Sequence, residues 1–150
     1  FTDGSVNPQS GVGFGAFLLL ENLKSSVETL DSKIKIKKFE NTSSTKLELE
    51  TLLWALDAVE LKNSTLAIYT DCQNIIGLPA RRDGFEAKKY MTSKAKLIKN
   101  HQLYKEFFKR LDSLDCELIK VKGHKKSSQK GEIDEIFTLV DRATREALRS

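Results

Sequence analysis

The order of apolar and amphipathic stretches along the chain constrains its fold more than any other feature. Residues 13–20 are almost wholly apolar and residues 33–39 alternate lysine with isoleucine, which predicts a buried strand followed by a half-exposed one. Further strands are expected over residues 65–70 and 116–122, and helices over 46–61, 73–78, 102–114 and 133–148. Strands that come first and then alternate with helices indicate an α/β domain, whose later strands join a mixed sheet through crossover helices.

The length of 150 residues suits one domain, so we expect residues 1–150 to form a single folding unit. Phe1 lies in the middle of a strand-like pattern, and we expect the start of that first strand to lie upstream. Residues 79–100 form a basic connector, and a loop that long inside a compact domain is usually functional or mobile. No apolar run is long enough to span a bilayer and no signal peptide is recognisable, which predicts a cytoplasmic protein without a membrane partner. Cys72 and Cys116 lack metal-ligand spacing, and we interpret them as reduced core residues.

Positive charge is concentrated in one part of the chain. Residues 81–130 hold fifteen Lys or Arg against six Asp or Glu, whereas the whole chain has a net charge of +4. A basic segment beside an acidic remainder suits a polyanion held near a carboxylate-rich centre, and a solvated lysine-rich helix face is the structural alternative.

Acidic residues stand where predicted strands end. Asp3 follows the presumed first strand, and the glycine-spaced stretch 7–15 after it permits a tight return and a close backbone approach by a ligand. Asp71 ends the apolar strand over 65–70, at the carboxyl edge where ligands bind in open α/β sheets. An Asp-Gly turn and a helix N-cap are the structural alternatives for these two aspartates.

Two helices offer a choice between acids. Glu48 falls roughly 70° from the centre of its helix's leucine stripe and Glu50 about 130°, so Glu48 is expected to lean over the sheet and Glu50 to face water. On the C-terminal helix, Asp134 and Asp141 lie seven residues apart on one helix edge. Periodicity therefore does not choose between these two.

Four short motifs, in this order along the chain, resemble the ribonuclease H family. They are Thr2-Asp3-Gly4-Ser5 with Asn7-Pro8, Lys46-Leu47-Glu48-Leu49, Thr70-Asp71-Cys72-Gln73 and Val121-Lys122-Gly123-His124. The resemblance covers nearly the whole chain and implies a five-stranded mixed sheet, with the first three strands antiparallel and helices flanking it. It also implies an endonuclease that hydrolyses the RNA strand of RNA/DNA hybrids and leaves 5′-phosphate and 3′-hydroxyl ends. The expected partner is the hybrid duplex, and the sequence indicates no obligate protein partner.

The resemblance also implies the residues of the active site. Asp3, Glu48, Asp71 and an aspartate of the last helix would hold two Mg²⁺ ions, which Mn²⁺ can replace. His124 would shuttle a proton or help the product leave. The spacing after His124 in many family members favours Asp134, but the small residues that follow Asp141 match the family's final helix, so we take Asp141. Paired Mg²⁺ ions can stabilise both the entering and the leaving oxygen, and clustered carboxylates need such cations because they otherwise repel one another.

Hybrid recognition requires contacts to the 2′-hydroxyls of the RNA strand and to the phosphates of the DNA strand. The expected contacts to the RNA strand are Gly4, Ser5, Asn7, Ser44, Thr45 and Gln73. The expected contacts to the DNA phosphates are Arg81, Arg82, Lys88 and Lys89. The chain departs from the family here, because Ser43-Ser44-Thr45 stands where members often carry Asn, and Phe85 and Tyr90 stand in place of a tryptophan. Two other functions stay open: a DNA nuclease of the resolvase or integrase type, and a non-catalytic hybrid-binding module.

Overall fold

The computed structural model describes residues 1–23, 27–59, 65–122 and 131–150. Its strands are β1 (Thr2–Asn7), β2 (Val12–Phe17), β3 (Lys35–Phe39), β4 (Leu66–Thr70) and β5 (Cys116–Lys120). Its helices are α1 (Val27–Leu30), the 3-10 turn η1 (Asp31–Lys33), α2 (Ser44–Ala58), α3 (Gln73–Ala87), α4 (His101–Ser113) and α5 (Glu132–Arg149). This order of elements agrees with the α/β class expected from the sequence.

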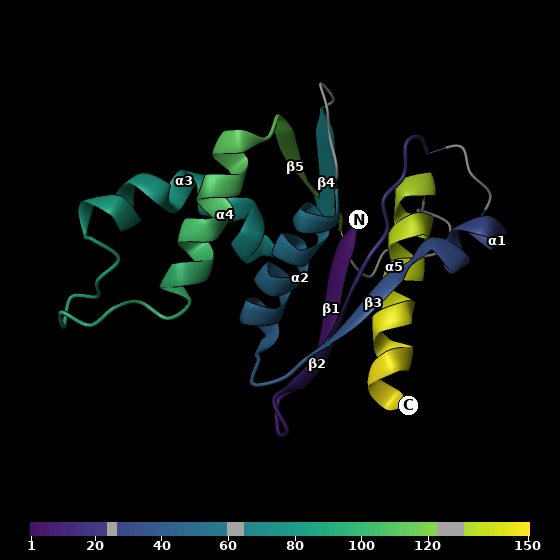
Figure 1. Cartoon of the computed structure of the whole chain (residues 1–150), viewed down its shortest axis with the longest axis horizontal. Helices are drawn as coiled ribbons and strands as arrows, with labels where there is room; N and C mark the ends of the chain where they lie inside the picture. The colour runs from purple at the N-terminus through teal and green to yellow at the C-terminus, as the bar shows by residue number, and fades with distance from the viewer. Residues whose placement is uncertain (24–26, 60–64, 123–130) are drawn as a thin grey trace.

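The strands form two sheets instead of the single five-stranded sheet that was expected. β1, β2 and β3 form an antiparallel sheet in that order, which confirms the predicted orientation of the first three strands. β4 and β5 form a separate parallel pair (Figure 1). Within the described ranges no backbone ladder joins β1 to β4, although the two strands are in contact. Side chains make this junction, since the ring of Phe1 stacks on that of Tyr69 at a centroid distance of 4.6 Å.

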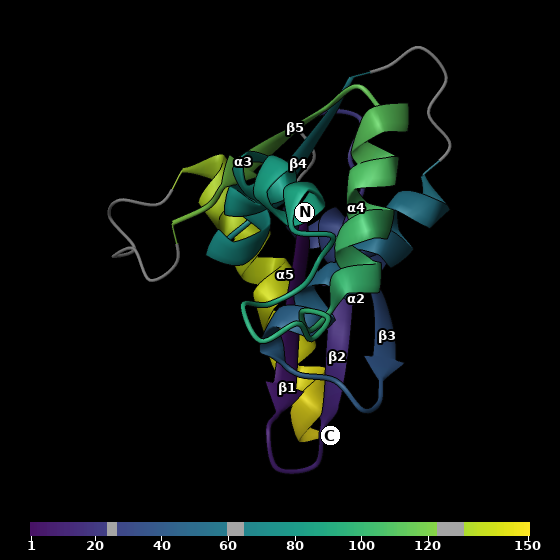
Figure 2. The same ribbon diagram turned by 90° about the vertical axis from the view of Figure 1, so that its left-hand side faces the viewer.

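Two long helices cover the three-stranded sheet. α2 and α5 each contact β1 and β2, and they lie on opposite faces, as Figures 1 and 2 show together. On the α2 face, a Cβ added at Gly13 would lie 2.7 Å from Cδ2 of Leu47, and one at Gly15 would overlap the side chain of Thr51. The sequence predicted that the glycines of this stretch permit a tight return, and Gly11, with a φ of 70°, lies in the β1–β2 turn. Gly13 and Gly15 have a further role that was not predicted. They allow α2 to approach the sheet closely.

Buried apolar side chains form two clusters. The larger lies between α2, β4, α3 and α4, and it includes the predicted leucine stripe of α2. The four leucines of that stripe, which belong to the cluster, are Leu49, Leu52, Leu53 and Leu56. Its fifth predicted member, Val59, follows the end of α2. The second cluster joins Ala16 and Leu18 to Ile136 and Val140 of α5. β3 is the outer edge of its sheet, where Ile36 is 47% exposed beside lysines that discourage further strand pairing.

Helix α3 is longer than the sequence predicted. It continues through Pro79 to Ala87, whereas we expected a helix over 73–78 and a connector over 79–100. Proline removes one N–H donor from a helix. The buried side chains of Ile75 and Leu78 anchor the preceding turn to the core, so the helix continues. The connector is therefore confined to residues 88–100.

Two smaller expectations concern the cysteines and membrane spans. Cys72 and Cys116 are free thiols, half-buried against the larger apolar cluster. In the part of the chain that the structure describes, no helix is both long enough and apolar enough to cross a membrane.

Candidate active site

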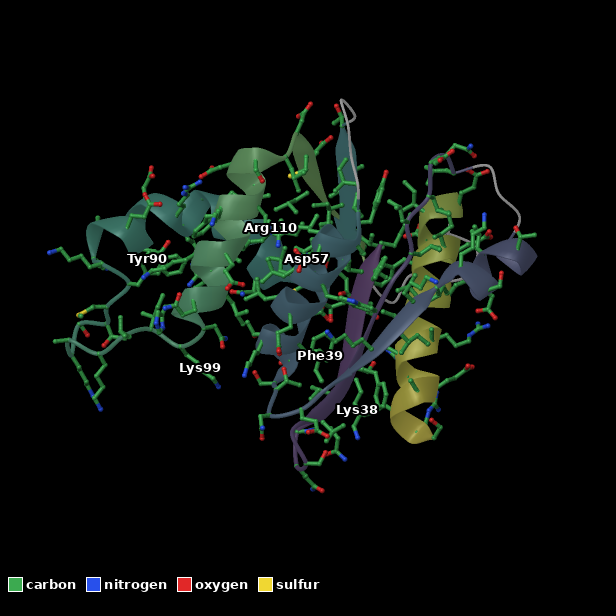
Figure 3. All side chains as sticks on the ribbon, in the orientation of Figure 1. Lys38, Phe39, Asp57, Tyr90, Lys99 and Arg110 are labelled. Carbon is green, nitrogen blue, oxygen red and sulfur yellow. The ribbon has the colours of Figure 1, made fainter. Side chains whose placement is uncertain are left out.

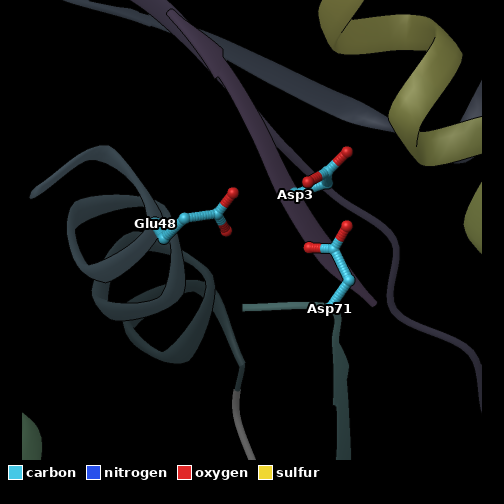
Figure 4. Close-up of side chains that lie close together, drawn as sticks. All are labelled: Asp3, Glu48 and Asp71. Atoms are coloured by element: carbon cyan, nitrogen blue, oxygen red, sulfur yellow. The ribbon is translucent and has the colours of Figure 1, made fainter. Parts of the chain in front are cut away.

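Three carboxylates converge where β1, α2 and the end of β4 meet. One oxygen each of Asp3, Glu48 and Asp71 lies within 4.8 Å of the other two (Figure 4). Asp3 is only 4% exposed, and Asp71 is the most exposed of the three. These are the three acids that the sequence placed at strand ends and on the sheet-facing edge of the helix.

Local structure explains why these side chains meet. Asp71 directly follows β4, as predicted. Asp3 does not follow the first strand, as was expected, but lies within β1 opposite Ala16, because the strand continues to Asn7. Glu48 lies one turn into α2, between Leu47 and Leu49, which are both buried. Because the glycines of β2 let α2 approach the sheet, Glu48 reaches β1, where the N–H of Gly4 donates a hydrogen bond to it.

The electrostatics of the cluster disfavour three simultaneous negative charges. Burial, followed by the charge of Glu48, raises the pKa of Asp3 well above the ordinary carboxyl range. Burial, followed by the charge of Asp71, likewise raises the pKa of Glu48. Among the described atoms, Oε2 of Glu48 is buried without a hydrogen-bond partner. These carboxylates are hard oxygen donors that converge on one point, and their negative charges repel one another. A divalent cation such as Mg²⁺ would compensate these charges, so the cluster fits such an ion.

Glu50 differs from Glu48 as the helix geometry predicted, with one correction. It is absent from the carboxylate cluster. It does not simply face water, however, because it is half-buried and its Oε1 accepts a 2.7 Å hydrogen bond from the hydroxyl of Thr42. Glu50 therefore anchors the segment that precedes α2.

The two candidate aspartates of α5 have different surroundings. Asp141 shares a side-chain hydrogen bond with Asp3, so it adjoins the cluster. Asp134 lies in the first turn of α5, where its Oδ2 accepts a 3.1 Å hydrogen bond from the N–H of Gly131. The geometry thus brings Asp141 to the site and gives Asp134 a capping contact at the helix start.

Sequence reasoning missed the contacts that position Asp141. The hydroxyls of Ser5 and Thr144 lie 2.9 Å apart, which joins β1 to α5, and Thr144 is fully buried. Arg145 donates from Nε to Oδ1 of Asp141 at 3.1 Å. The spacing of Asp141 and Arg145, four residues apart on one helix, is the signal that could have revealed this pair.

Several of the residues expected to contact the RNA strand already have partners within the protein. Asn7 closes the β1–β2 turn, where its Oδ1 accepts from the N–H groups of Gln9 and Ser10. Gln73 accepts a hydrogen bond from Lys120. Ser44 and Thr45 form the first turn of α2, one turn before Glu48. His124 lies outside the described residues.

The four basic residues expected at the DNA phosphates fall into two groups. Arg82 makes a bidentate ion pair with Asp112 at 2.6 and 2.8 Å and a further pair with Glu86. These contacts raise its pKa and lower that of Asp112. Arg81 donates to Asn74 and lies over the ring of Phe85. In contrast, Lys88 and Lys89 are exposed at the start of the connector.

The aromatic residues of the basic region belong to the core. Phe85 stacks on both Tyr90 and Tyr104, and Tyr90 is 7% exposed. Figure 3 shows Tyr90 at the start of the connector, with Lys99 near its end. Tyr90 and Phe85 therefore hold the connector against α4 and do not present an aromatic face to a ligand.

Comparison with known proteins defines the class of this protein. Residues 1–147 match the family model for RNase H, so the chain belongs to the RNase H family. Members of this family are nucleases that in general act on RNA/DNA hybrids. The chain is therefore a hydrolase that acts on nucleic acids.

A solved structure supports the same fold. The chain is similar to a foamy viral protease-reverse transcriptase, whose structure was determined in complex with dsDNA, with a TM-score of 0.64. The alignment covers 95% of this chain and 90% of that chain at 12% sequence identity, so this likeness establishes the fold alone. No curated protein matches the sequence.

Proposed function

We propose that this protein is a Mg²⁺-dependent endonuclease that hydrolyses the RNA strand of RNA/DNA hybrids and leaves 5′-phosphate and 3′-hydroxyl ends. One observation carries the proposal: Asp3, Glu48 and Asp71 converge within 4.8 Å in a chain of the RNase H family. The adjoining carboxylate of Asp141 completes a set of four acids. This set suits two divalent cations.

Asp3, Glu48, Asp71 and Asp141 would hold the cations, with Mn²⁺ able to replace Mg²⁺. When bound, divalent cations supply Lewis-acid stabilisation of the oxygens that enter and leave the phosphorus during phosphodiester hydrolysis. The donor set consists of carboxylates, which are the ligands that Mg²⁺ prefers over nitrogen or sulfur.

The protein's own groups hold this set in place. The N–H of Gly4 donates to Glu48 and thereby aims its carboxylate at β1. The Ser5–Thr144 hydrogen bond joins α5 to β1, and Arg145 restrains Asp141 from the solvent side. His124 is proposed to accept or donate a proton during turnover, which suits a side chain that titrates near neutral pH.

Substrate selection would come from two surfaces. Polar groups of β1 and of the first turns of α2 and α3, namely Asn7, Ser44, Thr45, Gln73 and the Gly4–Ser5 backbone, would contact the RNA strand. Lys88 and Lys89, with Arg81, would contact phosphates of the DNA strand, because they are cationic and lie on the exposed basic extension formed by α3 and the connector.

A cleavage assay on end-labelled duplexes tests this function. The substrates are an RNA/DNA hybrid, double-stranded RNA, double-stranded DNA and a four-way DNA junction, each with Mg²⁺ or with EDTA. We expect cutting of the hybrid's RNA strand alone, only with Mg²⁺, and products that a polymerase can extend from their 3′ ends. Preferred cleavage of junction or duplex DNA would contradict the proposal, as would binding to hybrid without cleavage.

Matched variants connect that activity to the cluster. Glu48→Gln and Asp71→Asn should each reduce cleavage about a thousand-fold or more, because each removes a charged ligand from the site. Glu50→Gln is the control, since glutamine retains an oxygen that can accept the hydrogen bond of Thr42. Equal damage from Glu50→Gln and Glu48→Gln would refute the assignment of Glu48.

A further inference from the structure

Lys120 holds the side-chain amide of Gln73 at the carboxyl edge of the parallel β4–β5 pair. Thr70 pairs with Lys120 at this edge, and the N–H of Val121 donates to the O of Thr70 at 2.8 Å. Gln73 begins α3, two residues after Asp71 of the carboxylate cluster. Nζ of Lys120 donates to Oε1 of Gln73 at 2.5 Å, and both residues are exposed.

This contact decides which end of the Gln73 amide is available to a ligand. An ammonium group has three donors and no acceptor, so it bonds only to the oxygen of the amide. The NH2 group of Gln73 is then directed away from Lys120, and within the described ranges no other side chain or backbone oxygen accepts from it. Gln73 is therefore held as a hydrogen-bond donor, whereas an unrestrained glutamine can present either its oxygen or its NH2 group.

The next amide along α3 has the same polarity but is closed to a ligand. Nη1 of Arg81 donates to Oδ1 of Asn74 at 3.0 Å, so the Asn74 amide also directs its NH2 group away from a cation. That nitrogen is buried and has no partner among the described atoms. Of these two amides, only that of Gln73 is exposed and can offer its NH2 group to a duplex.

We propose that Lys120 is a positioning residue that makes Gln73 a donor to the minor groove of the bound duplex. This role rests on the proposed function, in which Gln73 contacts the RNA strand. The groups that match an NH2 donor there are acceptors, namely N3 of purines, O2 of pyrimidines and the 2′-hydroxyl oxygen of ribose. Such an acceptor is present at every base pair, so the contact would tolerate any sequence. Lys120 would act through Gln73 and not through a phosphate.

A double-mutant cycle on binding of the hybrid to the full chain tests this role. Affinities are measured in EDTA, so that binding is separated from cleavage. Lys120→Met keeps the aliphatic stem without the ammonium and should weaken binding about three- to tenfold, the effect of one hydrogen bond. In a Gln73→Met background the same change should have almost no further effect, because its partner is already absent. Lys120→Arg also donates without accepting and should retain the affinity.

Modified hybrids identify the acceptor. 3-Deazaadenine removes the base acceptor N3, and a 2′-deoxynucleotide in the RNA strand removes the 2′-hydroxyl. When each change is moved along the duplex one position at a time, one of them should abolish the effect of Lys120→Met at a single position. NMR of the protein without a duplex gives a second readout. The NH2 resonances of Gln73 should move towards those of a free glutamine in Lys120→Met and stay in place in Lys120→Arg.

The outcomes separate this role from the nuclease proposal. A coupled cycle with shifted Gln73 resonances would support the role, even if the chain cuts a different duplex. Cleavage of the hybrid together with an equal loss from Lys120→Met in both backgrounds would refute the role alone. A fall of about 0.9 in the slope of log K against log salt would then show that Lys120 meets a phosphate directly. Unchanged Gln73 resonances in Lys120→Met, or full affinity of that variant, would equally overturn the role.

Discussion

Among individual side chains, the two aspartates of α5 differ most sharply in their environment. Asp141 bonds to Asp3 and to Arg145, whereas Asp134 caps the N–H of Gly131. They lie two helical turns apart, roughly 10.5 Å along the axis, so a single cation-binding cluster can use only one of them. Helical periodicity placed both on one edge, and the contact with Asp3 distinguishes them.

We expect Asp141→Asn to reduce Mg²⁺-dependent cleavage about a thousand-fold or more, because it removes a negative charge beside Asp3. Asp134→Asn should retain most activity, since asparagine can still cap Gly131. Asp134→Ala should instead lower the free energy of unfolding by about 1 kcal/mol, as loss of a cap does. Cleavage rates and urea melts of the three variants distinguish these effects, and the reverse order of activities would contradict the assignment of Asp141.

Among secondary-structure elements, the fit of α2 against β2 determines whether Glu48 reaches the site. Gly15→Ala would place a methyl group against Thr51 and should lower the free energy of unfolding by about 1–3 kcal/mol, as overpacking does. Gly77→Ala in α3 is the matched control. Nothing lies within 4 Å of its Cβ position, and it should raise stability by about 0.5–1 kcal/mol. Similar melts for both variants would show that α2 can move away from β2 at little cost.

Among the basic residues of α3 and the connector, we expect Lys88 and Lys89 to bind nucleic acid and Arg82 to stabilise the fold. Replacing Lys88 and Lys89 with alanine should reduce the slope of log K against log salt for hybrid binding by about 1.8, if each lysine meets one phosphate. Arg82→Ala should leave that slope unchanged and lower the thermal midpoint, because its guanidinium pairs with Asp112 and Glu86. Fluorescence anisotropy at several salt concentrations measures the slope. A reduced slope for Arg82→Ala would reassign this arginine to the nucleic-acid surface.

The stability of the entire fold should depend on pH and on divalent cations through the carboxylate cluster. The pKa of Glu48 is raised from 4.5 to about 8 and that of Asp3 from 3.8 to about 10. Between the ordinary and the raised pKa of each group, the folded state binds more protons than the unfolded state. Stability in EDTA should therefore fall as the pH rises from about 4 through 8 and towards 10.

Mg²⁺ should reverse this trend, because it binds the ionised cluster of the folded state and stabilises it by mass action. We expect thermal melts in EDTA and in Mg²⁺ to diverge with increasing pH, and Asp3→Asn to reduce both the pH dependence and the gain from Mg²⁺. Parallel pH profiles with and without Mg²⁺ would contradict the proposed cation site.

The antiparallel start of the sheet was implied by the resemblance to the ribonuclease H family. The residues by themselves predicted the α/β class and three of the clustered acids. These follow from local patterns, because strand ends, helical periodicity and short motifs depend on residues close together in the chain. Glu48 could be preferred to Glu50 because both lie on one helix, whose leucine stripe defines the buried face.

Tertiary structure alone decided the surroundings of Asp141, the partner of Arg82, the length of α3 and the number of sheets. These features depend on contacts between residues that are far apart in the sequence. The hydrogen bond between Asp3 and Asp141 spans more than a hundred residues, and the pairing of Arg82 with Asp112 joins two helices. α3 extends past Pro79 because core packing outweighs a lost hydrogen bond, which no local pattern records. The division into two sheets likewise depends on where β1 meets β4, and there the contact is between the rings of Phe1 and Tyr69.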